Sequence, residues 1–145
     1  MLVIFSDIHL TDESTANNVK SEVFREILKG RIINNAKDNK AKEIRIVLLG
    51  DIIDLVRTDY WLKKKIPMAS RPWGGTLDPS TAMNSNHNKI EIQFNEIMDE
   101  VLSTKSCRAM MKMLNDIAEE SGKYTKVTYI VGNHDRVFWN FESLQ

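Results

Sequence analysis

Three short polar motifs, each directly after an apolar run of strand-like character, constrain the fold of this chain more than any other feature. The apolar runs cover residues 2–5, 44–49 and 127–131. They lead into Ser-Asp-Ile-His at 6–9, Gly-Asp-Ile-Ile-Asp at 50–54 and Gly-Asn-His-Asp at 132–135. An α/β protein brings distant ligands to one sheet edge by ending short buried strands in such side chains. The pattern therefore predicts an α/β domain with a polar site at that edge.

The segments between these runs carry helical patterns. Apolar residues from Val19 to Ile32 recur at helical spacing and predict a helix, which the polar segment 34–42 is expected to break. A right-handed crossover through this helix makes the first two strands parallel. The first run is apolar throughout, which is typical of a strand covered on both faces. Two amphipathic patterns, at 90–102 and 110–118, predict two further helices, the second ending near Gly122 as a C-cap.

Residues 57–89 show no sustained period and contain all three prolines, which predicts a lid-like insertion. Its first part, 57–71, holds five cations and one acid beside Tyr60 and Trp61, with Trp73 just beyond. These cations and rings could grip a phosphorylated substrate or stack on nucleic acid. They could equally form a solvated charge run with the aromatic residues in the core. The sequence leaves both interpretations open.

The bulk properties narrow the function classes. At 145 residues the chain has the size of one domain, and its zero net charge gives no general attraction to nucleic acid or anionic membranes. The single cysteine, Cys107, excludes an internal disulfide and a thiolate metal cluster, and its helical apolar neighbours predict a buried structural thiol. The apolar start of the chain is too short for a signal peptide or a membrane span, so we expect a cytoplasmic location.

The first two motifs supply candidate metal ligands. Asp7 and His9 are two positions apart, so in extended chain their side chains point to the same side and can hold one divalent ion. Gly50 allows a sharp turn at the strand end, and the two oxygens of Asp51 can bridge two ions. Asp54 is expected to be an acceptor that orients a ligand.

The third motif combines an amide, an imidazole and a carboxylate. Asn133 can bind a metal through its amide oxygen, His134 can donate a proton, and Asp135 is a candidate for fixing the tautomer of His134. With the first two motifs this is a mixed nitrogen and oxygen set, which suits Mn, Fe or Zn.

Together, the motifs at 7–9, 50–54 and 132–135 resemble the first three signatures of the calcineurin-like metallophosphoesterases. The resemblance implies a layered αββα sandwich, of which this chain supplies roughly the first half. It implies two divalent ions, foremost Mn²⁺, with Asp7 and His9 on the first, Asp51 bridging and Asn133 on the second. His134 would stand near the scissile phosphate, and a bridging hydroxide would attack phosphorus in line.

The family also uses a later lone histidine and a Gly-His-x-His motif, and neither occurs in these 145 residues. His87 precedes the third motif, and we expect it to be a surface loop histidine. The expectation is therefore a single domain, 1–145, that is truncated at its C-terminus. A missing C-terminal segment or a partner chain would complete the metal site.

Three functional hypotheses follow. The first is a metal-dependent phosphomonoesterase or phosphodiesterase acting on a nucleotide, lipid precursor or nucleic acid, with Arg57 and Arg136 as candidate substrate contacts. A DNA nuclease of the same superfamily is a variant of it. The second is a catalytically incomplete interaction or scaffold module that keeps the fold. The third is a response-regulator-like or nucleotide-binding α/β domain that uses the acidic strand ends for Mg²⁺. It leaves His9, Asn133 and His134 without a role.

Overall fold

Three parallel strands form the only sheet in the described part of the chain. The computed structural model describes residues 1–15, 19–68, 71 and 87–139, with the backbone alone described at 87–89 and 139. The strands are β1 (Leu2–Phe5), β2 (Glu43–Leu49) and β3 (Tyr124–Ile130), in the order β1-β2-β3. Both strand pairs are parallel, which confirms the predicted mixed α/β class and the parallel first pair.

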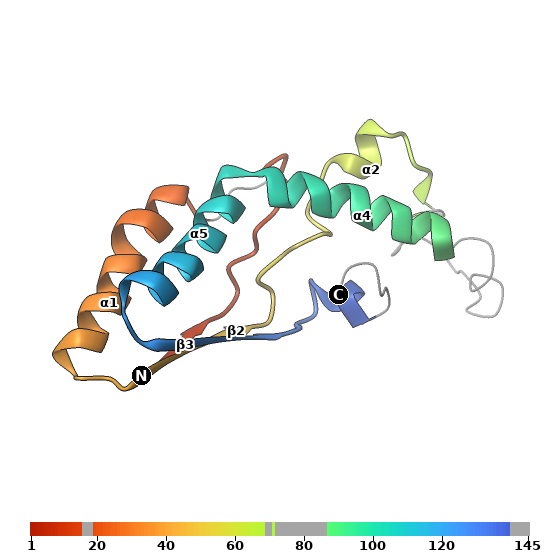
Figure 1. Cartoon of the computed structure of the whole chain (residues 1–145). Coiled ribbons are helices and arrows are strands. Elements are labelled where there is room, and N and C mark those ends of the chain that lie inside the picture. Colours follow the sequence, from red (N-terminus) through yellow and green to blue (C-terminus); the bar gives the residue numbers. More distant parts are fainter. Residues whose placement is uncertain (16–18, 69–70, 72–86, 140–145) are drawn as a thin grey trace.

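Helices cover one face of this sheet (Figure 1). The π-helical segment η1 (Val23–Leu28) continues into α1 (Lys29–Asp38), and α5 (Lys105–Glu120) packs against η1, α1 and β3. Helix α4 (His87–Ser103) extends this layer beyond the strand ends and packs against α5. Alternate residues of β2, namely Ile44, Ile46 and Leu48, are buried and form the centre of the core.

The opposite face of the sheet is open in the described part of the chain. Leu2 and Ile4 are 61% and 55% exposed, and Leu49 and Ile130, paired across β2 and β3, are also exposed. The prediction that β1 is covered on both faces is therefore wrong for these residues. A continuous apolar run favours a strand covered on both faces, so the exposure of Leu2 and Ile4 could not be predicted from it. The second sheet of a layered αββα sandwich stays a prediction.

The first helix is longer than predicted. The polar segment from position 34 was expected to break it, but α1 continues to Asp38. Ile32, Ile33 and Ala36 are buried on the side of α1 that faces the core, so the polar residues between and after them form its solvent face. The π-helical segment η1, which accommodates one extra residue per turn, changes the phase of the apolar pattern before α1 begins.

Helix α5 begins and ends with recognisable caps. The side chain of Thr104 accepts a hydrogen bond from the N–H of Cys107 at the start. At the end, Gly122 follows Ser121 with a φ of 62°, which confirms the predicted stop near Gly122. Cys107 itself is fully buried, and burial raises the pKa of its thiol to about 11. This confirms the prediction of a structural thiol.

Part of the predicted insertion is helical. The short helix α2 (Tyr60–Lys63) buries Tyr60 and Trp61, and the Tyr60 hydroxyl donates a hydrogen bond to Glu96 of α4. Burial and the Glu96 carboxylate raise the pKa of Tyr60. The sequence left open whether the aromatic residues grip a ligand or lie in the core, and the burial of Tyr60 and Trp61 supports the core position. Trp73 lies outside the described residues.

His87 is the first residue of α4, so the expectation of a loop position was wrong for its backbone, and its side chain lies outside the described residues. Among the described helices, none combines the length and the apolar character that a bilayer crossing requires.

Candidate metal centre

The first and second motifs run side by side after their strands end. The N–H of His9 donates to the carbonyl of Asp51 at 2.9 Å, and the N–H of Leu10 donates to the carbonyl of Ile52 at 2.8 Å. The third strand joins them, since the N–H of Gly50 donates to the carbonyl of Ile130 at 2.7 Å. Sheet-like pairing thus continues into the polar segments and holds them together at the carboxyl edge of the sheet.

Several residues of these motifs adopt left-handed backbone conformations. Asp7, His9 and Asp51 have φ values of 55°, 51° and 51°, and Gly50 has 65°. Such values are uncommon for residues with a side chain and persist only where surrounding contacts enforce them. Strained backbone at three predicted metal ligands is a pattern found at functional sites.

Gly132 lets the third motif approach the second. A Cβ atom at this position would lie 2.4 Å from Oδ1 of Asp51 and 2.6 Å from its backbone nitrogen, closer than real Cβ atoms come. The N–H of His134 donates to the same Asp51 Oδ1 at 2.9 Å. The glycine of the third motif is therefore a packing requirement of the site, which sequence reasoning had not assigned.

Three of the four predicted metal ligands lie together. One potential ligand atom from each of Asp7, His9 and Asp51 lies within 4.8 Å of the other two. Asp7 is exposed, His9 is partly buried and Asp51 is nearly buried, so the cluster opens to solvent on the Asp7 side. Two carboxylates and one imidazole at this spacing fit a divalent cation.

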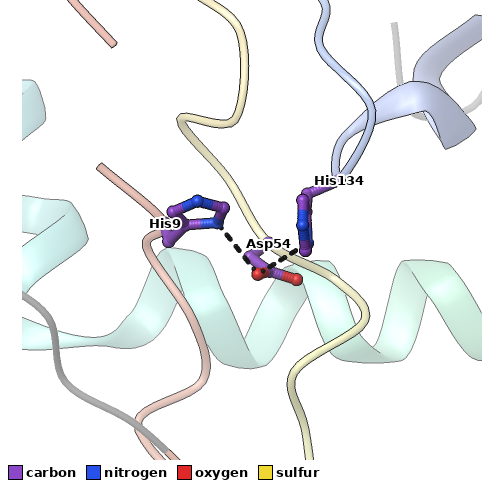
Figure 2. Close-up of side chains that lie close together, drawn as sticks. All are labelled: His9, Asp54 and His134. Carbon is purple, nitrogen blue, oxygen red and sulfur yellow. Dashed lines mark hydrogen bonds and ion pairs between the residues drawn. The ribbon is translucent and has the colours of Figure 1, made fainter. Parts of the chain in front are cut away.

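Asp54 connects the two histidines of the site (Figure 2). Its Oδ2 lies 3.0 Å from Nδ1 of His9 and 3.0 Å from Nδ1 of His134, and the two rings meet edge to face at 4.7 Å. Arg57 Nε is 3.2 Å from the same oxygen. Asp54 was predicted to orient a ligand, and these contacts place it where it can orient both imidazoles.

The charge of Asp54 is stabilised although the residue is fully buried. Burial by itself raises the pKa of Asp54, but the N–H groups of Arg57 and Val56, the charge of His134 and the hydrogen bond from His9 together lower it. The net effect is a pKa below the usual range, so the carboxylate is ionised at neutral pH. The hydrogen bond from Nδ1 of His9 leaves Nε2 with a free lone pair, the arrangement that metal-binding histidines commonly use.

Nδ1 of His134 is buried and has no hydrogen-bond partner among the described residues, although it lies 3.0 Å from Oδ2 of Asp54. An imidazole held beside a carboxylate and next to a cluster of candidate ligands is suited to proton transfer.

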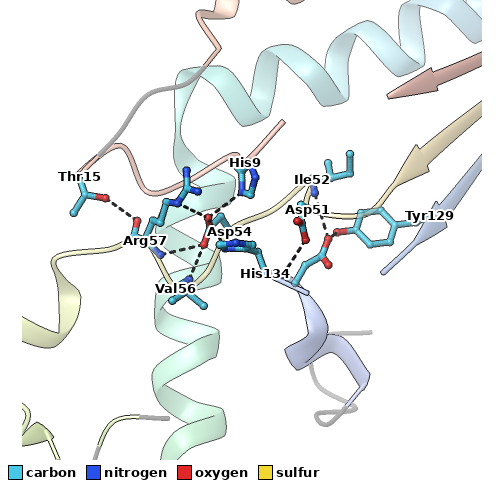
Figure 3. A network of polar contacts seen from close by, with 10 residues as sticks. His9, Thr15, Asp51, Ile52, Asp54, Val56, Arg57, Tyr129 and His134 are labelled. Atoms are coloured by element: carbon cyan, nitrogen blue, oxygen red, sulfur yellow. Dashed lines mark hydrogen bonds and ion pairs between the residues drawn. The ribbon is translucent and has the colours of Figure 1, made fainter. Parts of the chain in front are cut away.

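Asp135 is buried, and two of its hydrogen-bond partners, Ile52 and Tyr129, lie near Asp51 in Figure 3. Its carboxylate accepts hydrogen bonds from the backbone N–H groups of Gly132 and Ile52 and from the hydroxyl of Tyr129. Burial and the Asp135 carboxylate raise the pKa of Tyr129. Asp135 therefore fastens the third motif to the second, and the expected contact to His134 is made by Asp54. Asp135 was the sequence candidate for this contact because it directly follows His134, and only the turn geometry assigns the contact to Asp54.

The remaining predicted residues lie at the edge of the site. Asn133 and Arg136 are exposed, with Arg136 at the start of η3 (Arg136–Trp139). Arg57, a predicted substrate contact, pairs with Asp54 while its side chain stays 44% exposed. Its carbonyl accepts a hydrogen bond from Thr15 of the first-motif loop at 2.9 Å.

Comparisons of the chain with protein-family models, curated proteins and solved structures gave no match. The assignment of function therefore depends on the residues and geometry of the candidate centre.

Proposed function

We propose that this chain is a metal-dependent phosphoester hydrolase, or the part of one that carries most of its metal centre. One observation carries the proposal. Potential ligand atoms of Asp7, His9 and Asp51 lie within 4.8 Å of one another, and the carboxylate of Asp54 contacts the rings of His9 and His134. This arrangement agrees with the ligand set that the resemblance to calcineurin-like metallophosphoesterases implies.

Asp7, His9 and Asp51 would hold one divalent ion, with Mn²⁺ favoured and Fe or Zn as alternatives. Asp51 and the exposed Asn133 would contribute to a second. Bound ions supply charge neutralisation on phosphate oxygens and an activated water. Asp54 keeps His9 in the tautomer that presents Nε2, since Nδ1 is hydrogen-bonded to the carboxylate.

His134 would donate a proton to the leaving oxygen or stabilise charge on the phosphoryl group. Its backbone N–H is fixed by Asp51 and its ring lies against His9, so it stands beside the metal ligands. The exposed Arg136 lies two positions further and is suited to contact a substrate phosphate.

The first ion would have three protein ligands and the second only two, which leaves coordination positions for further protein groups as well as for water. We propose that a partner chain or a further segment of the protein supplies them. The open apolar face of the sheet, with Leu2 and Ile4, supports such a second layer.

A second candidate function is an interaction module that retains the fold without catalysis. The small ligand set among the described residues and the open sheet face favour it. A nuclease is less well supported, because Tyr60 and Trp61 are buried and cannot stack on bases.

Measuring metal content and phosphoesterase activity on the same preparation distinguishes the enzyme from the interaction module. We expect EDTA-treated protein to take up Mn²⁺ and then to release p-nitrophenol from p-nitrophenyl phosphate or its bis ester. Asp51→Asn should lose both properties, while Asp38→Asn, an exposed change at the end of α1, should keep both. Metal uptake without turnover supports the interaction module. Failure to bind any divalent ion in excess contradicts both the enzyme and its metal centre.

A further inference from the structure

A basic cleft lies between η1 and α5, on the helical layer and apart from the candidate metal centre. It is a cavity of about 400 Å³, with Arg25 on the η1 side and Lys105, Arg108 and Lys112 on the α5 side. Figure 1 shows α5 beside the helix that η1 and α1 form. The three α5 residues are spaced by three and four positions, so they share one face of the helix.

Positive charge is concentrated in this cleft although the whole chain has a net charge of zero. Four cations and one acid, Glu22, line it, which gives the lining a net charge of +3. The pair between Arg25 and Glu22 is 3.4 Å long and more than half exposed, so it neutralises little.

The α5 cations differ in their pairing. Lys112 forms a 2.7 Å ion pair with Asp116, which lies one turn further along the helix. Arg108 donates to the backbone carbonyls of Ser103 and Thr104, which leaves its charge unneutralised. Lys105 is exposed and makes no ion pair within the described part of the chain. Two formal positive charges thus remain without a carboxylate partner.

Glu13, an acid close to this end of α5, is already engaged. Glu13, in the loop after the first motif, accepts hydrogen bonds from the hydroxyl and N–H of Ser106 at 2.8 and 3.4 Å. Ser106 is buried, so this contact lies beneath the helix surface that carries Lys105 and Arg108. The contact anchors the α5 wall of the cleft.

We propose that this cleft is a binding site for a small anion with two or more phosphate groups. Guanidinium and ammonium groups are the side chains that bind phosphate oxygens best. The volume falls in the range of small-molecule sites and exceeds the needs of a single phosphate. No aromatic side chain lines the cleft among the described residues, so the stacking platform of a nucleic-acid site is missing there.

Titration of the full chain with inorganic tripolyphosphate tests this site by calorimetry, with and without EDTA. Binding should persist in EDTA, because the site uses no metal. Arg25→Gln combined with Lys105→Gln removes one cation from each wall and should weaken binding at least about tenfold, since hydrogen bonds to charged groups are lost. Both side chains are exposed, and circular dichroism verifies that the variant folds.

Lys37→Gln combined with Lys126→Gln is the matched control. It makes the same change in net charge at exposed positions of α1 and β3, and tripolyphosphate affinity should be unchanged. An equal loss of tripolyphosphate affinity in both double variants would show nonspecific electrostatic attraction and contradict a binding site in the cleft. Loss of binding in EDTA would assign the anion to the metal centre. Equal affinity for sulfate, or tighter binding of a single-stranded oligonucleotide, would overturn the ligand class.

Discussion

Asp54 is the residue on which both imidazoles of the candidate centre depend. One oxygen, Oδ2, contacts His9 and His134, and the other accepts the N–H groups of Val56 and Arg57. A carboxylate that is buried, ionised and shared by two histidines fixes their orientation as a pair. In the proposed function, His9 would bind metal and His134 would transfer the proton.

Replacing His134 by asparagine should separate these roles. We expect His134→Asn to retain bound Mn²⁺ and to lower phosphoesterase turnover by about a hundredfold or more, the usual effect of removing a proton-transfer group. His87→Asn makes the same chemical change outside the three motifs and should leave turnover unaltered. If His134→Asn instead removes the metal, the proposed division between ligand and acid is wrong.

Asp54→Asn should weaken metal binding by about ten- to a hundredfold, because the carboxylate that orients His9 is lost. The pKa of Asp54 is lowered in the folded protein, so its ionised form stabilises the fold above its ordinary value of 3.8. That stabilisation is lost as the pH falls below this value through the folded pKa. Urea denaturation of metal-free protein should therefore show a large difference between wild type and variant at pH 7 and a smaller one at pH 3. An equal difference at both pH values would contradict this account of Asp54.

At the scale of elements, α5 joins the candidate metal centre to the helical layer. Its first turn is capped by Thr104 and donates hydrogen bonds to Glu13 through Ser106, while its core-facing side buries Met110, Met113 and Ile117. Since Glu13 follows the first motif closely, the start of α5 supports the loop that carries Asp7 and His9. Changes in the cap are expected to lower the free energy of unfolding more than they lower metal affinity.

Thr104→Ala should lower the free energy of unfolding by about 1 kcal/mol, because the N–H of Cys107 loses its side-chain acceptor. Thr104→Ser keeps the hydroxyl and should remain close to wild type. Equilibrium denaturation in urea measures both. A loss of equal size in the serine variant would show that packing of the Thr104 methyl group, rather than the cap, matters.

Sequence patterns predicted the strands and the α5 stop because each depends on local residues. Apolar runs ended by polar residues located β1, β2 and β3, and Gly122 marked the end of the helix. The role of Asp54 was only partly predictable. Asp135 directly follows His134 in sequence, and only the fold shows that it turns toward Gly132 and Ile52.

Other features could not be predicted because they depend on tertiary contacts. The π-helical segment η1 leaves an ordinary amphipathic pattern in the sequence and could not be predicted. The extension of α1 to Asp38 was missed because its polar residues, which form the solvent face, looked like a helix break. The close approach of Gly132 to Asp51 depends on how two loops meet. The open face of the sheet depends on which elements cover it, whereas the apolar residues of β1 favoured cover on both faces.

At the scale of the whole molecule, the described residues form a helical layer on one face of a sheet, with the candidate metal centre at the carboxyl edge. The centre draws its residues from the segments that follow all three strands. An ion bound there would link those segments and favour the folded state over the unfolded chain.

Mn²⁺ should therefore raise the unfolding temperature. At about a hundred times its dissociation constant, a ligand specific for the folded state adds about 2.7 kcal/mol, which corresponds to about 5 to 10 °C for a chain of this size. Differential scanning fluorimetry with EDTA or Mn²⁺ measures the shift. Asp51→Asn should abolish it and Asp38→Asn should preserve it. A shift that survives Asp51→Asn would place the ion elsewhere.

The left-handed backbone at Asp7, His9 and Asp51 has a practical consequence for mutagenesis. An alanine scan of these positions changes two quantities together, because it deletes the donor atom and also installs a residue that resists this region of φ. A drop in metal affinity after such a change would mix lost coordination with a loosened loop. Asparagine, which tolerates the same torsion and keeps the shape of aspartate, isolates the chemical contribution of Asp7 and Asp51.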